Sequence, residues 1–310
     1  MISYKSEKAF INMMTGGLIM KKMTAYLLGL ALMISMTACS SADSDDSGES
    51  NDNTPVETEE ISFEEITVVD NEQCTIKITG IEPDNMWGYT LNAYLKNKSE
   101  DKTYMFSVQN ASVNGLQTDP LFATTVAAGK KSNEEINFSE DLSSYGLTDF
   151  TDIQLTFRVY DNDDWMADDV ALQTVHVYPY GEDKATTFVR ESQSTDHVIV
   201  DNENVTIIVT GYDEDGIWGY TMHLYLVNKT DSEVMFSVDD VSVNGFMADP
   251  FWAVSVAAGK AAFSDVSWSD STFEENDITT VEEIEMTWSV YNNEDWTQDD
   301  IYNETVVLNP

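Results

Sequence analysis

The segment 65–180 of this chain recurs as the segment 196–310, and this duplication constrains the fold more than any other feature. The matching motifs are Trp87-Gly88-Tyr89 with Trp218-Gly219-Tyr220, Ser112–Gly115 with Ser242–Gly245, and Val126–Lys130 with Val256–Lys260. The offset is 131 residues at the first motif and 130 residues at the other two. So small a drift predicts one fold copied twice, with insertions and deletions confined to loops.

A secretory leader precedes the two copies. Residues 20–39 read MKKMTAYLLGLALMISMTAC, in which two lysines precede an apolar run that ends in small residues before Cys39. We expect residues 1–38 to be a signal peptide whose true start is Met20. The segment Met36-Thr37-Ala38-Cys39 resembles a lipobox, which implies acylation of Cys39 and anchoring in the bilayer on the extracytoplasmic face of a bacterial cell membrane. The alternative is an uncut anchor, although a spanning helix needs about 20 apolar residues.

Charge and composition describe the region after the leader. Residues 39–64 are rich in Ser, Asp, Glu and Thr, which predicts a disordered acidic tether because few apolar side chains are available to pack. The whole chain has 15 basic and 56 acidic residues and a formal net charge of −41. Such a surface repels phosphate backbones, so nucleic acid is excluded as a partner.

Alternating apolar and polar residues predict the fold class. Cys74, Ile76 and Ile78 alternate with polar residues, as do Met222, Leu224 and Leu226. About seven such strands in each copy predict an all-β chain of two tandem antiparallel immunoglobulin-like β-sandwich domains, 65–180 and 196–310, joined by a linker at 181–195. A barrel is the alternative. The Asn-Gly pairs predict tight hairpin turns, and only 139–148 and 270–277 are candidates for helical turns.

Two sandwich modules behind a lipobox and an acidic tether resemble the uncharacterised extracytoplasmic lipoproteins with immunoglobulin-like domains found in Gram-positive bacteria. The resemblance is architectural apart from the lipobox, and it carries no functional residues to this chain. Cys74 aligns with Val205 and is expected to face the core as a small apolar residue.

Acidic loops in both copies are candidate calcium sites. The candidate ligands, in the two copies, are Asp161, Asp163 and Asp164, and Glu294 and Asp295. Calcium takes several oxygen ligands from neighbouring carboxylates and carbonyls. The loops lack the glycine of the helix-loop-helix calcium pattern, so a simple turn is the competing interpretation and we expect no cofactor other than this possible ion.

The tryptophans admit a second kind of site. Trp87 and Trp218 could stack on sugar rings, but packing that closes the core is the preferred interpretation for both. Trp288 alternates with Met286 and Val290 and is therefore expected in the core.

The outward side of the strands differs between the copies. Lys77 aligns with Ile208, Lys96 with Val227, and Arg158 with Ser289. This loss of cations predicts a partner-binding face on the second domain, formed by Ile208 and Val227 beside Tyr225 and Tyr291. It would contact either the first domain or another molecule. Neutral drift without consequence is the alternative.

No catalytic motif is present in the sequence: it has no GxSxG, no HExxH and no phosphate-binding glycine loop. We therefore expect a membrane-anchored binding module rather than an enzyme, with an unknown protein or glycan as its partner. The alternatives are a cell-envelope glycan hydrolase that uses paired carboxylates, and a purely structural spacer.

Overall fold

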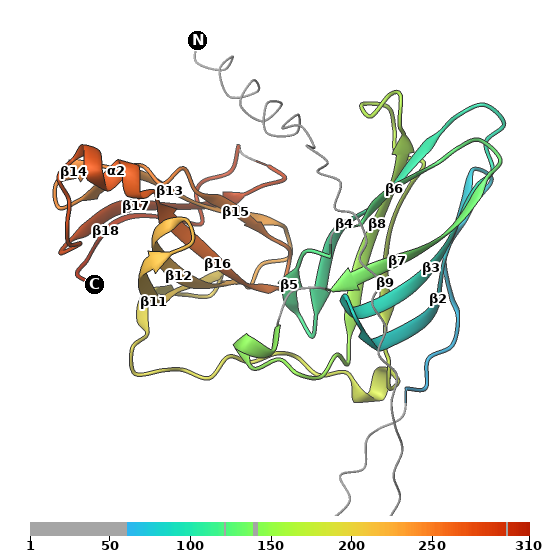
Figure 1. Cartoon of the computed structure of the whole chain (residues 1–310), viewed down its shortest axis with the longest axis horizontal. Helices are drawn as coiled ribbons and strands as arrows, with labels where there is room; N and C mark the ends of the chain where they lie inside the picture. Colours follow the sequence, from blue (N-terminus) through green and yellow to red (C-terminus); the bar gives the residue numbers. More distant parts are fainter. Residues whose placement is uncertain (1–60, 121, 139–141, 296) are drawn as a thin grey trace, which may run out of the picture. The chain divides into compact units, whose positions relative to one another are not determined.

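The computed structural model describes residues 61–120, 122–138, 142–295 and 297–310 (Figure 1). The predicted signal peptide at 1–38, Cys39 and the predicted tether as far as residue 60 lie outside the described residues. Within the described residues, no helix is long and apolar enough to cross a membrane.

The first sandwich has nine strands in two sheets. Their bounds are β1 Ile66–Asp70, β2 Cys74–Asn85, β3 Gly88–Asn97, β4 Tyr104–Val113, β5 Leu116–Thr118, β6 Ala123–Val126, β7 Lys131–Phe138, β8 Ile153–Asp161 and β9 Ala171–Val177. One sheet has the order β1-β2-β3-β7. In the other, β8 lies between β4 and β9, and the short strands β5 and β6 both pair with β4.

The second sandwich follows the same strand order. Its strands are β10 His197–Asp201, β11 Val205–Gly216, β12 Gly219–Asn228, β13 Val234–Val243, β14 Phe246–Met247, β15 Ala253–Val256, β16 Ala261–Trp268, β17 Ile284–Asn292 and β18 Tyr302–Leu308. One sheet is β10-β11-β12-β16, and β13 pairs with β14, β15 and β17 in the other, which ends at β18. In each sandwich the chain crosses between the sheets three times, as in immunoglobulin-like folds. The predicted fold class is confirmed.

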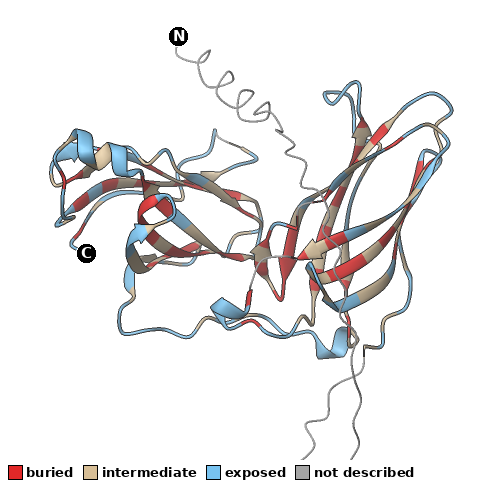
Figure 2. Ribbon diagram, viewed as in Figure 1, coloured by how far each residue is buried: buried red, intermediate tan, exposed pale blue. Residues whose placement is uncertain are grey.

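The residues with a two-residue period form the interior of each sandwich. Ile76, Leu91 and Phe157 are fully buried in the first, and Leu224 and Trp288 are fully buried in the second. Figure 2 shows the buried residues concentrated along the strands. Trp288 is thus a core residue, as predicted. The buried Cys74 is one as well, and burial raises the pKa of its thiol to about 11.

Tight turns and short helices connect the strands. Asn114 and Gly115 have φ of 51° and 81°, and Asn244 and Gly245 have φ of 50° and 81°. The Asn-Gly pairs therefore supply the left-handed residues of these hairpins, as predicted. Each sandwich has two more strands than the seven expected, because the short β5, β6, β14 and β15 were too brief to show a period. The helical turns are η1 Leu142–Tyr145 and α2 Asp270–Glu275, with a further turn, η2 Glu182–Lys184, after β9.

Candidate interaction surfaces

A short parallel strand pair joins the two sandwiches. Leu116 of β5 pairs with Ala261 of β16, and the Ala261 amide donates to the Gly115 carbonyl at 3.0 Å. The side chain of Gln117 bonds to the Ser255 carbonyl and the Ala257 amide, both at 2.9 Å. The edge strand β16 of the second sandwich is therefore capped by the end of the first.

The outer face of sheet β10-β11-β12-β16 is apolar at this junction. Tyr225 and Ala261 belong to the apolar cluster of the first sandwich, and Ile208, Val227 and Phe263 pack against it. We call these five residues the apolar face. Ile208 pairs with Tyr225 across β11 and β12, so the outward strand phase inferred from sequence holds for both.

Tyr291 does not belong to this face, so its grouping with Tyr225 was wrong. Tyr291 lies on β17 and pairs with Met235, in the other sheet of the second sandwich, and Ser289 lies on the same strand. The sequence period places a residue on one side of its own sheet, but it does not say which sheet the strand joins.

Two aromatic residues complete the junction, Tyr145 from the first sandwich and Phe188 from the linker. The ring of Tyr145 stacks on Phe263 with 3.9 Å between centroids and 8° between planes, and Phe188 contacts Phe263 edge-on at 6.2 Å. Neither residue was predicted as part of a site from the sequence. For Phe188 the available signal was the apolar Phe188-Val189 pair in a mostly polar linker.

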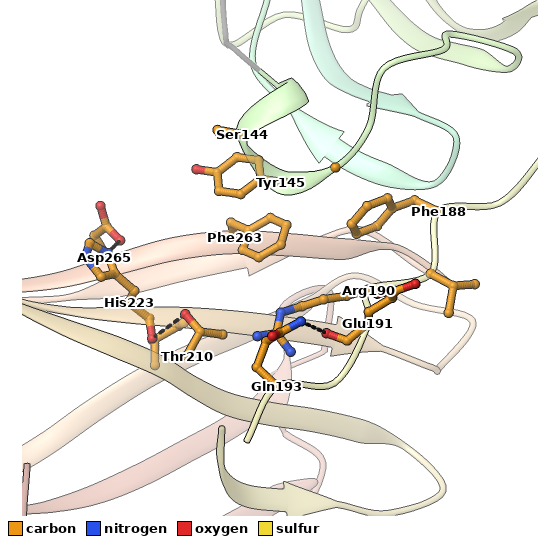
Figure 3. A pocket seen from close by; sticks show the side chains of 13 residues that line it. Ser144, Tyr145, Phe188, Arg190, Glu191, Gln193, Thr210, His223, Phe263 and Asp265 are labelled. Carbon is orange, nitrogen blue, oxygen red and sulfur yellow. Dashed lines mark hydrogen bonds and ion pairs between the residues drawn. The ribbon is translucent and has the colours of Figure 1, made fainter. Parts of the chain in front are cut away.

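A cleft of about 690 Å³ lies beside these rings (Figure 3). On one side, His223 Nδ1 and Asp265 Oδ1 are 2.7 Å apart. On another, Arg190 makes two hydrogen bonds to Asp196, at 2.6 and 2.7 Å, and its guanidinium lies 5.7 Å from the ring centroid of Tyr225. The Arg190 guanidinium holds the pKa of Asp196 below its usual value. Arg190 and Asp265 of the cleft thus already have partners, and Glu191 also lines it.

The equivalent outer face of the first sandwich has a different chemistry. Lys77, Tyr94, Lys96, Lys131 and Asn133 occupy the places of the five apolar residues, and we call them the lysine face. Lys77 pairs with Glu65 at 2.7 Å. Lys96 and Lys131 stand directly opposite each other on β3 and β7, and within the described residues neither has a carboxylate partner. The Lys131 ammonium lies 6.0 Å from the Tyr94 ring centroid.

The acidic loops do not form a metal cluster in the described residues, where no group of three or more His, Cys, Asp or Glu side chains could hold an ion. Asp161 pairs with Lys102 at 2.8 Å and accepts from the Asp163 amide at 3.1 Å. The hydrogen bond from Lys102 lowers the pKa of Asp161. The carboxylate of Asp295 accepts from two side chains of its own loop. Asp163, Asp164 and Glu294 are exposed. Calcium binding stays a prediction.

The hairpin tips carry exposed tryptophans, so the interpretation of Trp87 and Trp218 as core residues was wrong. Trp87 is 61% exposed and Trp218 is 78% exposed, and the preceding Met86 and Ile217 are more exposed still. Both pairs occupy the turn between two long strands, β2–β3 and β11–β12. Their neighbours Tyr89 and Tyr220 turn inward, which satisfies the strand period without the tryptophans. The cause is that the strand pairing is irregular just before each turn.

Comparisons with known proteins give no family. The chain matches no protein-family model and no curated protein. Among solved structures it is similar to the CsuC-CsuE chaperone-tip adhesion subunit complex of Acinetobacter baumannii pili, at 11% identity and a TM-score of 0.21, over 70% of this chain and 90% of that one. It is also similar to the exo-chitosanase CsxA of Amycolatopsis orientalis, at 12% identity and a TM-score of 0.22, over 77% of this chain but only 27% of the enzyme.

Proposed function

We propose that this protein is a lipid-anchored binding module of the bacterial cell envelope, without catalytic activity, that recognises a protein or glycan through its two tryptophan-bearing hairpin tips. The leader and Cys39 support the anchor and the extracytoplasmic location. The acidic surface supports a partner other than nucleic acid.

The observation that carries the proposal is the pair of exposed apolar tips. Met86-Trp87 and Ile217-Trp218 occupy the same turn of the two sandwiches, and all four side chains are largely exposed. A large aromatic side chain left in water costs free energy unless a partner covers it, and tryptophan is enriched where binding energy is concentrated. Loops at the ends of a rigid sandwich are a common place for recognition.

The proposed absence of catalysis is supported by the ion-pair partners of the buried carboxylates. Among the described residues, the buried Asp161 pairs with Lys102, and Asp196, whose side chain is 5% exposed, pairs with Arg190, so neither has a second carboxylate as its partner. A glycan hydrolase needs two carboxylates on either side of the bond that breaks.

The test replaces both tips in the full-length chain. Trp87→Ser with Trp218→Ser is expected to lower the affinity for an envelope protein or glycan at least tenfold, while the melting temperature stays within about 2 °C because both side chains are solvated. Trp165→Ser is the matched control, since Trp165 is 66% exposed on a different loop. Equal binding by the double variant and the wild type would show that the tips are not the contact.

A further inference from the structure

The junction inside the chain shows how one sandwich end docks on a sandwich face. Gly115, at the turn after β4, and the start of β5 lie against the edge of β16, and Leu116 is only 1% exposed there. The apolar face covers the same end from the side, through contacts with the core cluster of the first sandwich. Both partners in this contact are elements that the chain possesses twice.

The second sandwich has an equivalent end at the turn before β14, and the apolar side chains of that end are exposed. Asn244 and Gly245 form the same left-handed turn as their counterparts, and Phe246 occupies the place of Leu116. Phe246 is 49% exposed and Met247 is 68% exposed. Two large apolar side chains thus stand in water at the position that the first sandwich buries.

The lysine face of the first sandwich is equivalent to the apolar face of the second, and within the described residues no other sandwich packs on it. β7 is the last strand of its sheet, whereas the equivalent β16 continues into β5. Lys96 and Lys131 face each other across β3 and β7, and like charges in directly opposed positions destabilise a sheet. An acidic group placed over the pair would remove that cost. Lysines on an edge strand can instead serve to keep other strands away, which is the competing explanation.

The two free surfaces have opposite charge. At the junction, a small hollow places Asn110 and Gln154 of the first sandwich beside the Ala257–Lys260 turn of the second. The second sandwich has Asp240 and Glu285 at the positions of Asn110 and Gln154. The amides of Glu282 and Glu283 donate to Asn244 as those of Thr151 and Asp152 donate to Asn114, so Glu282 adds an acid in place of Thr151, whereas Glu283 keeps the acid of Asp152. The free end is therefore acidic where the free face is basic.

We propose that the chain associates head to tail with a second copy of itself, so that the end at Gly245–Met247 of one molecule docks on the lysine face of the next. The contact repeats the internal junction, with Phe246 of one copy against Lys131 of the other and with the carboxylates of Asp240 and Glu285 beside the adjoining Ala127–Lys130 turn. Because the two surfaces differ, the contact is heterologous and can extend into a chain of molecules. It does not use the tryptophan tips.

The test is a charge exchange in the full-length chain with Cys39→Ser, which removes lipid from the assembly. Wild-type protein in about 0.15 M salt is expected to show an average mass that rises with concentration in sedimentation. Lys96→Glu with Lys131→Glu, and separately Glu283→Lys with Glu285→Lys, should each weaken association at least tenfold. An equimolar mixture of the two variants should associate again, because each offers the other a complementary surface.

Two controls distinguish this specific contact from a non-specific effect of net charge on association. Glu304→Lys changes the net charge as much as one of the end substitutions, but it lies on the exposed side of β18 and should leave association unchanged. As a second measurement, Lys131→Cys with Phe246→Cys should give a ladder of disulfide-linked oligomers, since their counterparts Ala261 and Leu116 are paired residues. A monomeric wild type at every concentration, or a mixture that stays monomeric, would overturn the proposal.

Discussion

The outer faces of sheets β1-β2-β3-β7 and β10-β11-β12-β16 share a strand order, but they have opposite relations to water. In the first sandwich this face carries Lys77 and Lys96, which are half-buried, and the exposed Lys131. In the second, the equivalent Ile208, Val227 and Ala261 contact the other sandwich. The inward faces of both sheets are equally apolar and equally buried. The comparison shows that a duplicated sandwich can keep its core and change its partner by substitutions on one face alone.

The largest expected effect comes from giving the second face the chemistry of the first. Ile208→Lys with Val227→Lys places two ammonium groups against the apolar cluster of the first sandwich, which should cost about 2–3 kcal/mol of docking free energy. Both sandwiches should stay folded, because the substituted side chains point away from the core. Calorimetry is expected to resolve two unfolding transitions where the wild type has one.

The reciprocal exchange is the control for that experiment. Lys77→Ile with Lys96→Val leaves the junction untouched and breaks one exposed ion pair, so unfolding should change by no more than about 1 kcal/mol. If Ile208→Lys with Val227→Lys unfolds as a single, unshifted transition, the apolar face does not couple the sandwiches.

A smaller effect is expected at the lysines that follow the Ala-Ala-Gly turns. Burial at the junction lowers the pKa of Lys260, whereas the equivalent Lys130 is exposed. Because the folded pKa is the lower one, the unfolded chain holds the extra proton, and stability rises as the pH passes the folded pKa towards 10.5. Lys260→Met should therefore raise the free energy of unfolding at pH 7 by less than about 1 kcal/mol and flatten this alkaline rise.

Lys130→Met should leave the free energy of unfolding at pH 7 unchanged, since its side chain is already solvated. Urea unfolding at pH 7 and pH 10 measures both variants. A loss of stability in Lys260→Met would mean that the ammonium is stabilised at the junction, contrary to its burial.

The smallest expected effect concerns acid. The pKa of Asp161 lies below 3.8 in the folded protein because Lys102 donates to it, so the stability from this pair is present above pH 3.8 and is lost as the pH falls through the folded value. The second sandwich has Asn292 at this position. Asp161→Asn should make the stability of the first sandwich depend less steeply on pH in the acid range. Intrinsic fluorescence during acid titration measures this. The reciprocal Asn292→Asp should leave the two loop amides bonded to that side chain and so preserve the fold.

The sequence determined the strands, their inward residues and their turns. Cys74, Leu224 and Trp288 are buried where the two-residue period requires, because a strand must place alternate side chains on one side of its sheet. Asn114-Gly115 and Asn244-Gly245 form turns because few other residues accept a positive φ. The drift of one residue between the copies likewise follows from sequence alone.

Only the tertiary structure decided what covers each outward face. Ile208 and Lys77 have the same strand phase, but the face of Ile208 is partly buried because the first sandwich packs on it and because Tyr145 and Phe188 contact Phe263. The same holds for Tyr291, whose sheet depends on pairing with Met235, and for Trp87 and Trp218, which project from turns where the period ends. A local pattern reports on which side of a strand a residue lies, whereas the identity of its neighbours depends on segments that meet only after the chain has folded.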